Sequence, residues 1–111
     1  MTVPSGVSEE IMSTSSFQMS SFTPVDDTIV NQNSTSVSFS FSSAFKTHIS
    51  VEIWSEGDQG ATYADKQETN TNGADDAGLS FTVPAGVNLH YKITVSGDPS
   101  SNNTVHVHIE W

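Results

Sequence analysis

Histidines alternate with valine or isoleucine at the C-terminal end of the chain, where His106, His108 and Glu110 take every second position. A period of two puts these polar side chains on one face of a β-strand. Imidazole and carboxylate groups are ligands for Zn²⁺ or Cu²⁺. If the preceding strand pairs with this one as a hairpin, His90 lies opposite His108 or Glu110. We then expect a metal site formed by His90, His106 and His108. The alternative is a set of surface histidines whose charge changes near about pH 6.

Acidic and amide side chains are concentrated in a second region, residues 55–78, which has no regular apolar pattern. Asp58, Asp75 and Asp76 lie there in oxygen-rich turns with glycine. Ca²⁺ takes about six to eight oxygen ligands, which loops between strands can supply. Neither turn has EF-hand spacing. These residues therefore predict a calcium site from composition, and the alternative is a solvated acidic loop that keeps the protein soluble.

Two aromatic residues adjoin this acidic region. Trp54 precedes it, on the outward face of its strand, and Tyr63 lies within it. Aromatic rings stack on the apolar faces of sugars, while carboxylates and amides bind the hydroxyl groups. We therefore predict a ligand-binding site formed by Trp54, Tyr63, Asp58, Asp75 and Asp76. The alternative for Trp54 is packing beneath the folded-back loop.

Short stretches of period-two alternation must position these residues, and no helix pattern interrupts them. They predict strands at 16–20, 28–30, 36–41, 48–54, 79–83, 87–95 and 104–111, with the odd-numbered apolar residues in the core. Turns rich in Gly, Pro, Asn and Ser separate the strands. The sequence thus predicts an all-β fold, a single antiparallel β-sandwich or jelly-roll-like domain of about seven to eight short strands. It spans residues 16–111 and follows a Ser/Thr-rich N-terminal arm, residues 1–15.

Composition limits the partners of this domain. Thirteen Asp and Glu oppose three Lys, with no Arg, for a net charge of −10. Nucleic acids and anionic membranes are therefore disfavoured, and a neutral ligand or a divalent cation suits the field better. The chain has no cysteine, which excludes disulfides and thiolate metal sites. It has no signal-peptide or transmembrane pattern, so we expect a cytosolic protein, a leaderless secreted one, or the mature form of a secreted one.

The motifs of common enzyme families are absent from the sequence, including the nucleophile elbow, the P-loop and the HExxH zinc motif. We therefore expect a non-enzymatic binding module, lectin-like and assisted by calcium if by any cofactor. In style the chain is similar to the small cysteine-free β-sandwich lectins of bacteria and fungi. One alternative is a self-assembling, homo-oligomeric subunit of a filament, coat or appendage, whose N-terminal arm adds a strand to a neighbour's sheet. Another is a small membrane-active or insecticidal β-protein.

Overall fold

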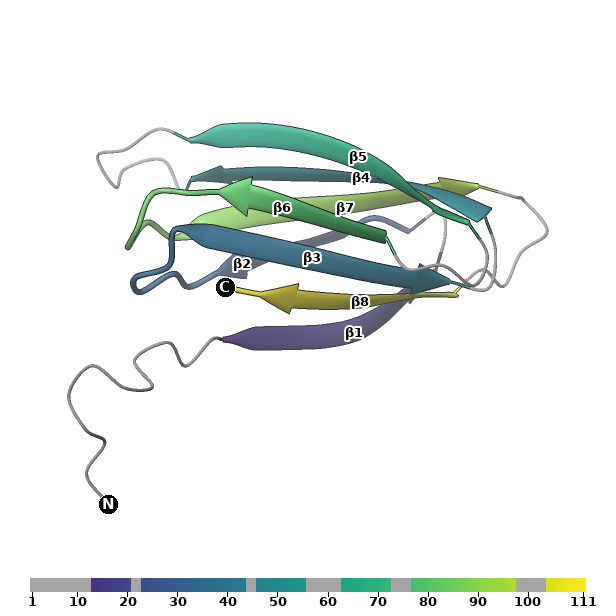
Figure 1. Cartoon of the computed structure of the whole chain (residues 1–111), viewed down its shortest axis with the longest axis horizontal. Helices are drawn as coiled ribbons and strands as arrows, with labels where there is room; N and C mark the ends of the chain where they lie inside the picture. Colours follow the sequence, from purple (N-terminus) through teal and green to yellow (C-terminus); the bar gives the residue numbers. More distant parts are fainter. Residues whose placement is uncertain (1–12, 21–22, 44–45, 56–62, 73–76, 98–103) are drawn as a thin grey trace, which may run out of the picture.

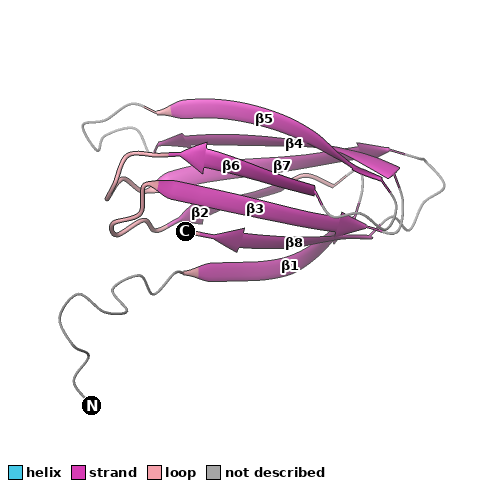
Figure 2. Cartoon of the chain, in the orientation of Figure 1, coloured by secondary structure: helices cyan, strands magenta, loops and turns pink. Residues whose placement is uncertain are grey.

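Eight strands form two four-stranded antiparallel sheets that pack face to face (Figure 1). The computed structural model describes residues 13–20, 23–43, 46–55, 63–72, 77–97 and 104–111. Within these ranges every regular element is a strand (Figure 2), and none is a helix long and apolar enough to cross a membrane. The strands are Thr14–Ser20 (β1), Val25–Ile29 (β2), Ser36–Ser43 (β3), Lys46–Ser55 (β4), Ala64–Asn72 (β5), Ala77–Thr82 (β6), Leu89–Gly97 (β7) and Thr104–Glu110 (β8).

The chain changes sheet at almost every connection. Sheet A has the strand order β1-β8-β3-β6 and sheet B the order β2-β7-β4-β5. Only β4 and β5 are consecutive in sequence and also neighbours in one sheet. This interleaved order, with eight strands in two sheets, is that of a jelly roll. The predicted all-β sandwich is confirmed.

The two sheets meet over a core made of odd-numbered apolar residues, as the alternation predicts. Phe39 lies at its centre, with the rings of Phe41, Phe81 and Tyr91 within 6.2 Å, centroid to centroid. Burial raises the pKa of Tyr91 to about 12, with a smaller contribution from Asp27. The apolar residues less than one-tenth exposed are Met19, Ile29, Val37, Phe39, Phe41, Ile49, Val51, Ile53, Phe81, Val83, Val87, Leu89, Tyr91, Ile93, Val95, Val105, Val107 and Ile109. Because these side chains point inward, the even-numbered ones form the outer faces.

The predicted hairpin between the last two strands is wrong. β7 belongs to sheet B, where it pairs with β2 and β4, whereas β8 belongs to sheet A, where it pairs with β1 and β3. Sequential strands are neighbours in about two-thirds of cases, which made the hairpin the natural expectation. Both strands alternate in the same way because each has one face in the same core. The pattern therefore shows which face is buried but not which sheet a strand joins.

One strand, β5, is missing from the sequence prediction, which made residues 55–78 a continuous loop. β5 is an edge strand of sheet B, and its inward positions carry Asp65, Gln67, Thr69 and Thr71 in place of apolar residues. Of these four only Thr71 is buried, and its Oγ1 lies 2.6 Å from that of Thr47. Gln67 Nε2 donates to the carbonyl of Ser80 on β6, at 2.8 Å, and so links the edges of the two sheets. An edge strand held by polar contacts carries no hydrophobic alternation.

A buried asparagine organises one end of the sandwich. Asn31 is 2% exposed and follows β2. Its Nδ2 donates to the carbonyls of Ser34 and Pro84, and its Oδ1 accepts from the Ser34 N–H. Its own backbone N–H donates to Asn88 Oδ1. These bonds tie the β2–β3 connection to the turn before β7, in which Gly86 has a φ of 77°.

The C-terminal residue closes the same end. Trp111 extends the pairing of β8 with β1 by exchanging both backbone hydrogen bonds with Ser13. Its indole Nε1 donates to the carbonyl of Val30 at 3.0 Å, just after β2. The ring also packs against the core. Trp111 thus links the two sheets.

Asn31→Asp tests the importance of this end. The substitution keeps the shape of the side chain but replaces the Nδ2 donor with a carboxylate oxygen facing two carbonyl groups. Since buried polar groups without partners cost about 1–3 kcal/mol, and charged ones more, we expect the free energy of unfolding to fall by about 3 kcal/mol. Urea denaturation measures it. Asn33→Asp makes the same chemical change at an exposed position and should leave stability nearly unchanged.

Candidate functional site

Trp54 lies on the outer face of sheet B, near the end of the sandwich that Asn31 organises. It is opposite His90 on β7 and Ala64 on β5. The indole and the His90 imidazole are stacked, with centroids 5.5 Å apart and planes inclined by 12°. His90 therefore covers one side of the indole. On the other side the cross-strand neighbour is only a methyl group.

An open depression of about 400 Å³ adjoins Trp54 on the side of β5. We call it the Trp54 site, and its lining is Glu52, Ile53, Trp54, Ala64, Asp65 and Lys66. Glu52 lies opposite both Lys66 and Lys92, so charges of opposite sign alternate across the strands beside the depression. The site thus combines an aromatic surface with hydrogen-bond acceptors and a cationic donor.

Asp65 borders the depression, but its side chain lies on the other side of β5 from Trp54, because Asp65 is opposite the buried Ile53. Asp65 Oδ1 accepts from the backbone N–H of Lys66 at 2.8 Å, and Oδ2 accepts from Gln67 Nε2 at 3.2 Å. Since Gln67 also donates to Ser80, these bonds connect Asp65 to both sheet edges.

Tyr63, the other aromatic residue of the predicted site, has a different environment. Its carbonyl accepts from the backbone N–H of Ser55, the last residue of β4, and its own N–H donates to Ser55 Oγ. Its ring packs against the hydrophobic core, and its hydroxyl is buried without a hydrogen-bond partner among the described residues. Burial, and secondarily Asp65, raises the pKa of the phenol. The Tyr63 ring therefore belongs to the edge of the core and does not line the depression beside Trp54.

The three predicted acidic ligands, Asp58, Asp75 and Asp76, lie outside the described residues. Their segments are attached at opposite ends of β5. Residues 56–62 lead into the end at Ala64, beside Trp54, and residues 73–76 follow the end at Asn72. The nine residues of β5 separate these ends by about 26 Å, at roughly 3.3 Å per step.

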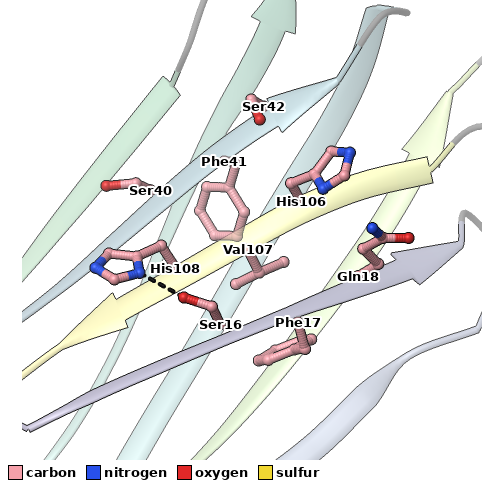
Figure 3. Close-up of a pocket in the computed structure, with 9 residues that line it drawn as sticks. All are labelled: Ser16, Phe17, Gln18, Ser40, Phe41, Ser42, His106, Val107 and His108. Carbon is pink, nitrogen blue, oxygen red and sulfur yellow. Dashed lines mark hydrogen bonds between the residues drawn. The ribbon is translucent and has the colours of Figure 1, made fainter.

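A second depression, of about 450 Å³, lies on the outer side of sheet A (Figure 3). The side chains around it are mostly hydroxyl, amide and imidazole groups. We call this surface the Ser/His face, and it consists of Ser16, Gln18, Ser40, Ser42, His106 and His108. Sequence reasoning found its histidines. It missed the serines and the glutamine, because their contribution depends on β1 and β3 lying on either side of β8.

A chain of hydrogen bonds crosses the Ser/His face. Ser16 Oγ lies 2.6 Å from His108 Nδ1, and His108 Nε2 lies 3.2 Å from Glu110 Oε2. When Nε2 carries the proton and donates to the Glu110 carboxylate, Nδ1 accepts a hydrogen bond from the Ser16 hydroxyl. A Ser–His–acid triad has the same order of donors and acceptors. His108 and Glu110 are each 43% exposed, however, and the depression is open to solvent. Such triads act in sites that exclude water. We therefore conclude that these hydrogen bonds orient the imidazole, and we derive no reaction from them.

The structure separates the three predicted metal-binding histidines. His90 is on the outer face of sheet B, and His106 and His108 are on that of sheet A. The placement of His90 opposite His108 or Glu110 is therefore wrong, for the reason given for β7 and β8. The rings of His106 and His108 point away from each other in Figure 3. Within the part of the chain that the structure describes, no three His, Asp or Glu side chains are grouped to hold a metal ion.

The fold has known counterparts among solved structures, although no protein-family model and no curated protein matches the chain. A structure of tripeptidyl peptidase 2 aligns with 86% of this chain, with a TM-score of 0.68 and 11% identity. A module named TmCBM61, in complex with β-1,4-galactotriose, also aligns with 86% of it, with a TM-score of 0.54 and 14% identity. The chain covers 8% of the first protein and 63% of the second.

A third counterpart matches over nearly its whole length. CorA, a surface-associated copper-binding protein of Methylomicrobium album BG8, aligns with 85% of this chain and 91% of its own, with a TM-score of 0.55 and 12% identity. These likenesses establish the β-sandwich fold, which carbohydrate-binding modules share. At this level of identity they establish nothing further.

A hydrogen-bonded histidine connects the edge strand β5 to its neighbour β4 in sheet B. His48 on β4 bonds through Nδ1 to Asn70 Oδ1 at 2.9 Å and through Nε2 to Glu68 Oε1 at 2.6 Å, both on β5. Because both ring nitrogens face oxygen acceptors, the imidazolium form is favoured. The bond to Asn70, and next the bond to Glu68, raise the pKa of His48 above its ordinary 6.5.

This raised pKa makes the stability of the protein depend on pH. The contribution of His48 is fully present below the unfolded-state pKa and is lost as the pH rises through the higher folded-state pKa. We expect Glu68→Gln to lower the His48 pKa and to reduce this pH dependence, as measured by histidine NMR titration and by thermal unfolding at several pH values. Glu52→Gln removes a carboxylate from the same face without touching His48 and should have the smaller effect. An unchanged His48 pKa in Glu68→Gln would contradict the assignment.

Proposed function

We propose that the protein is a carbohydrate-binding module and that its ligand occupies the Trp54 site. The observation that carries this proposal is the environment of the indole. His90 stacks on one side of it, and an open depression lies on the other, where Ala64 leaves room. A sugar ring placed there stacks its apolar C–H face on the indole, which is how aromatic side chains take up carbohydrate.

The polar groups of the Trp54 site suit a neutral sugar. Glu52 accepts hydrogen bonds from hydroxyl groups, and the exposed Lys66 donates to ring and hydroxyl oxygens. The Glu52 carboxylate, in a chain of net charge −10, disfavours sulfated or carboxylated glycans. We therefore expect neutral oligosaccharides to bind more tightly than acidic ones.

The comparison with TmCBM61 supports this proposal at the level of the fold. That module was solved with β-1,4-galactotriose, and its sandwich aligns with most of this chain. A β-sandwich of this fold can therefore bind an oligosaccharide. The choice of the Trp54 site rests on this chain's own residues.

Calcium is a separate part of the proposal. Asp58 belongs to the connection that enters β5 beside Trp54, whereas Asp75 and Asp76 belong to the connection at the other end of the strand. A calcium ion that assists the sugar would therefore use Asp58, and one bound by Asp75 and Asp76 would stabilise the protein. Glycan binding measured with calcium and with a chelator separates these roles.

Two substitutions test the site. Ala64→Leu fills the space beside the indole, and Trp54→Ala removes the stacking surface. On a glycan array followed by calorimetry, we expect each to weaken binding about tenfold or more, the equivalent of about 1.4 kcal/mol. Neither residue lies in the buried core, so the melting temperature should change little.

Matched controls place the binding on one face. Thr94→Leu adds the same kind of side chain at an exposed position of β7 outside the depression, and His106→Ala removes an imidazole from the Ser/His face. Both should bind as the wild type does. Wild-type protein that binds no glycan with or without calcium, or an Ala64→Leu protein with unchanged affinity, would overturn the proposal.

A further inference from the structure

The four sheet edges differ in how they are protected. An edge strand exposes unpaired N–H and C=O groups, and proteins prevent unwanted pairing there with charges or coverings. β2 carries Asp26 and Asp27, and β5 carries Asp65, Lys66 and Glu68. β6 has no charge, but the side chain of Gln67 covers its Ser80 carbonyl. β1, the outermost strand of sheet A in Figure 1, has neither kind of protection among the described residues.

The pairing of β1 with β8 shows which of its backbone groups face outward. Ser13 and Trp111 exchange both N–H···O bonds, so the odd-numbered residues of this ladder face β8. Hydrogen-bonded residues alternate with the others in an antiparallel ladder. The N–H and C=O groups of Thr14, Ser16, Gln18 and Ser20 therefore point away from the sheet.

We propose that β1 pairs antiparallel with β1 of a second copy, about a two-fold axis at Phe17. In this register Thr14 lies opposite Ser20 of the second copy, and Ser16 lies opposite its Gln18. Each residue whose N–H and C=O groups point outward then lies opposite another such residue of the second copy. All eight N–H···O bonds between the two strands can therefore form. Sheet A becomes one continuous eight-stranded sheet across the dimer.

Charge and burial both favour a second copy of this chain as the partner that pairs with β1. Each chain carries a net charge of −10, so self-association must occur where the surface is uncharged, and β1 has no ionisable side chain. Phe17 is half-buried and packs against the edge of the core. At the two-fold axis it meets its own counterpart as a non-hydrogen-bonded pair, in which side chains are closest. The dimer thus buries the exposed part of both rings.

Gln18→Pro removes one outward N–H from the edge while leaving the bonds to β8 intact, because proline is tolerated where an edge N–H faces solvent. Light scattering after size exclusion, over a wide range of protein concentration, should show the wild type approaching a dimer and Gln18→Pro remaining a monomer with a similar melting temperature. Gln18→Thr keeps the N–H and should dimerise. A wild type that is monomeric throughout, or a Gln18→Pro protein that associates equally well, would overturn the proposal.

Cysteine cross-linking tests the register without disturbing the backbone. The chain has no native cysteine. Residues in a hydrogen-bonded pair have Cα atoms about 5.5 Å apart, within the range of a disulfide. Mixing equal amounts of Ser16→Cys and Gln18→Cys protein under mild oxidation should therefore enrich the mixed disulfide dimer well beyond the roughly twofold excess that random pairing gives over either self-linked product. A mixed product at or below this random proportion would refute the register, even if Gln18→Pro had failed to fold.

Discussion

Each described strand must bury one face against the opposite sheet, and the remaining features of the molecule follow from this requirement. The odd-numbered side chains fill the space between the sheets, with Phe39 at the centre. Binding groups can then lie only on the outer faces, along the edges and at the ends. The Trp54 site, the Ser/His face and the β1 edge occupy such positions. The outward-facing side chains of these three surfaces are not part of the core, so substituting them should change the free energy of unfolding little.

The end of the sandwich near Trp54 combines structural contacts with the proposed binding site. Asn31 joins two connections there through its side-chain amide, and Trp111 links the sheets through its bond to the Val30 carbonyl. Asn88 accepts a hydrogen bond from the backbone N–H of Asn31. His90, two residues after Asn88, stacks on the indole of Trp54. These contacts hold the aromatic surface in place, which would lower the entropic cost of the proposed binding.

The alternation of apolar residues was enough to predict the fold class, the inward faces and most strands, because burial of one face imposes a period of two. β5 was missed because an edge strand held by Gln67 and Thr71 has no apolar alternation. The separation of His90 from His108 was missed because the same pattern arises in either sheet. Trp54 was correctly placed on an outer face, but its stacking on His90 and the space beside Ala64 depend on register, which no local pattern in the sequence specifies.

The most direct test of the central claim uses the two tryptophans as probes in one spectrum. Trp54 lines the proposed site, whereas the indole N–H of Trp111 is bonded to the carbonyl of Val30. During an NMR titration with a neutral oligosaccharide selected on the array, we expect the Trp54 indole signal to shift progressively and saturate while the Trp111 signal stays in place. Saturable binding that leaves the Trp54 signal unmoved would contradict the account.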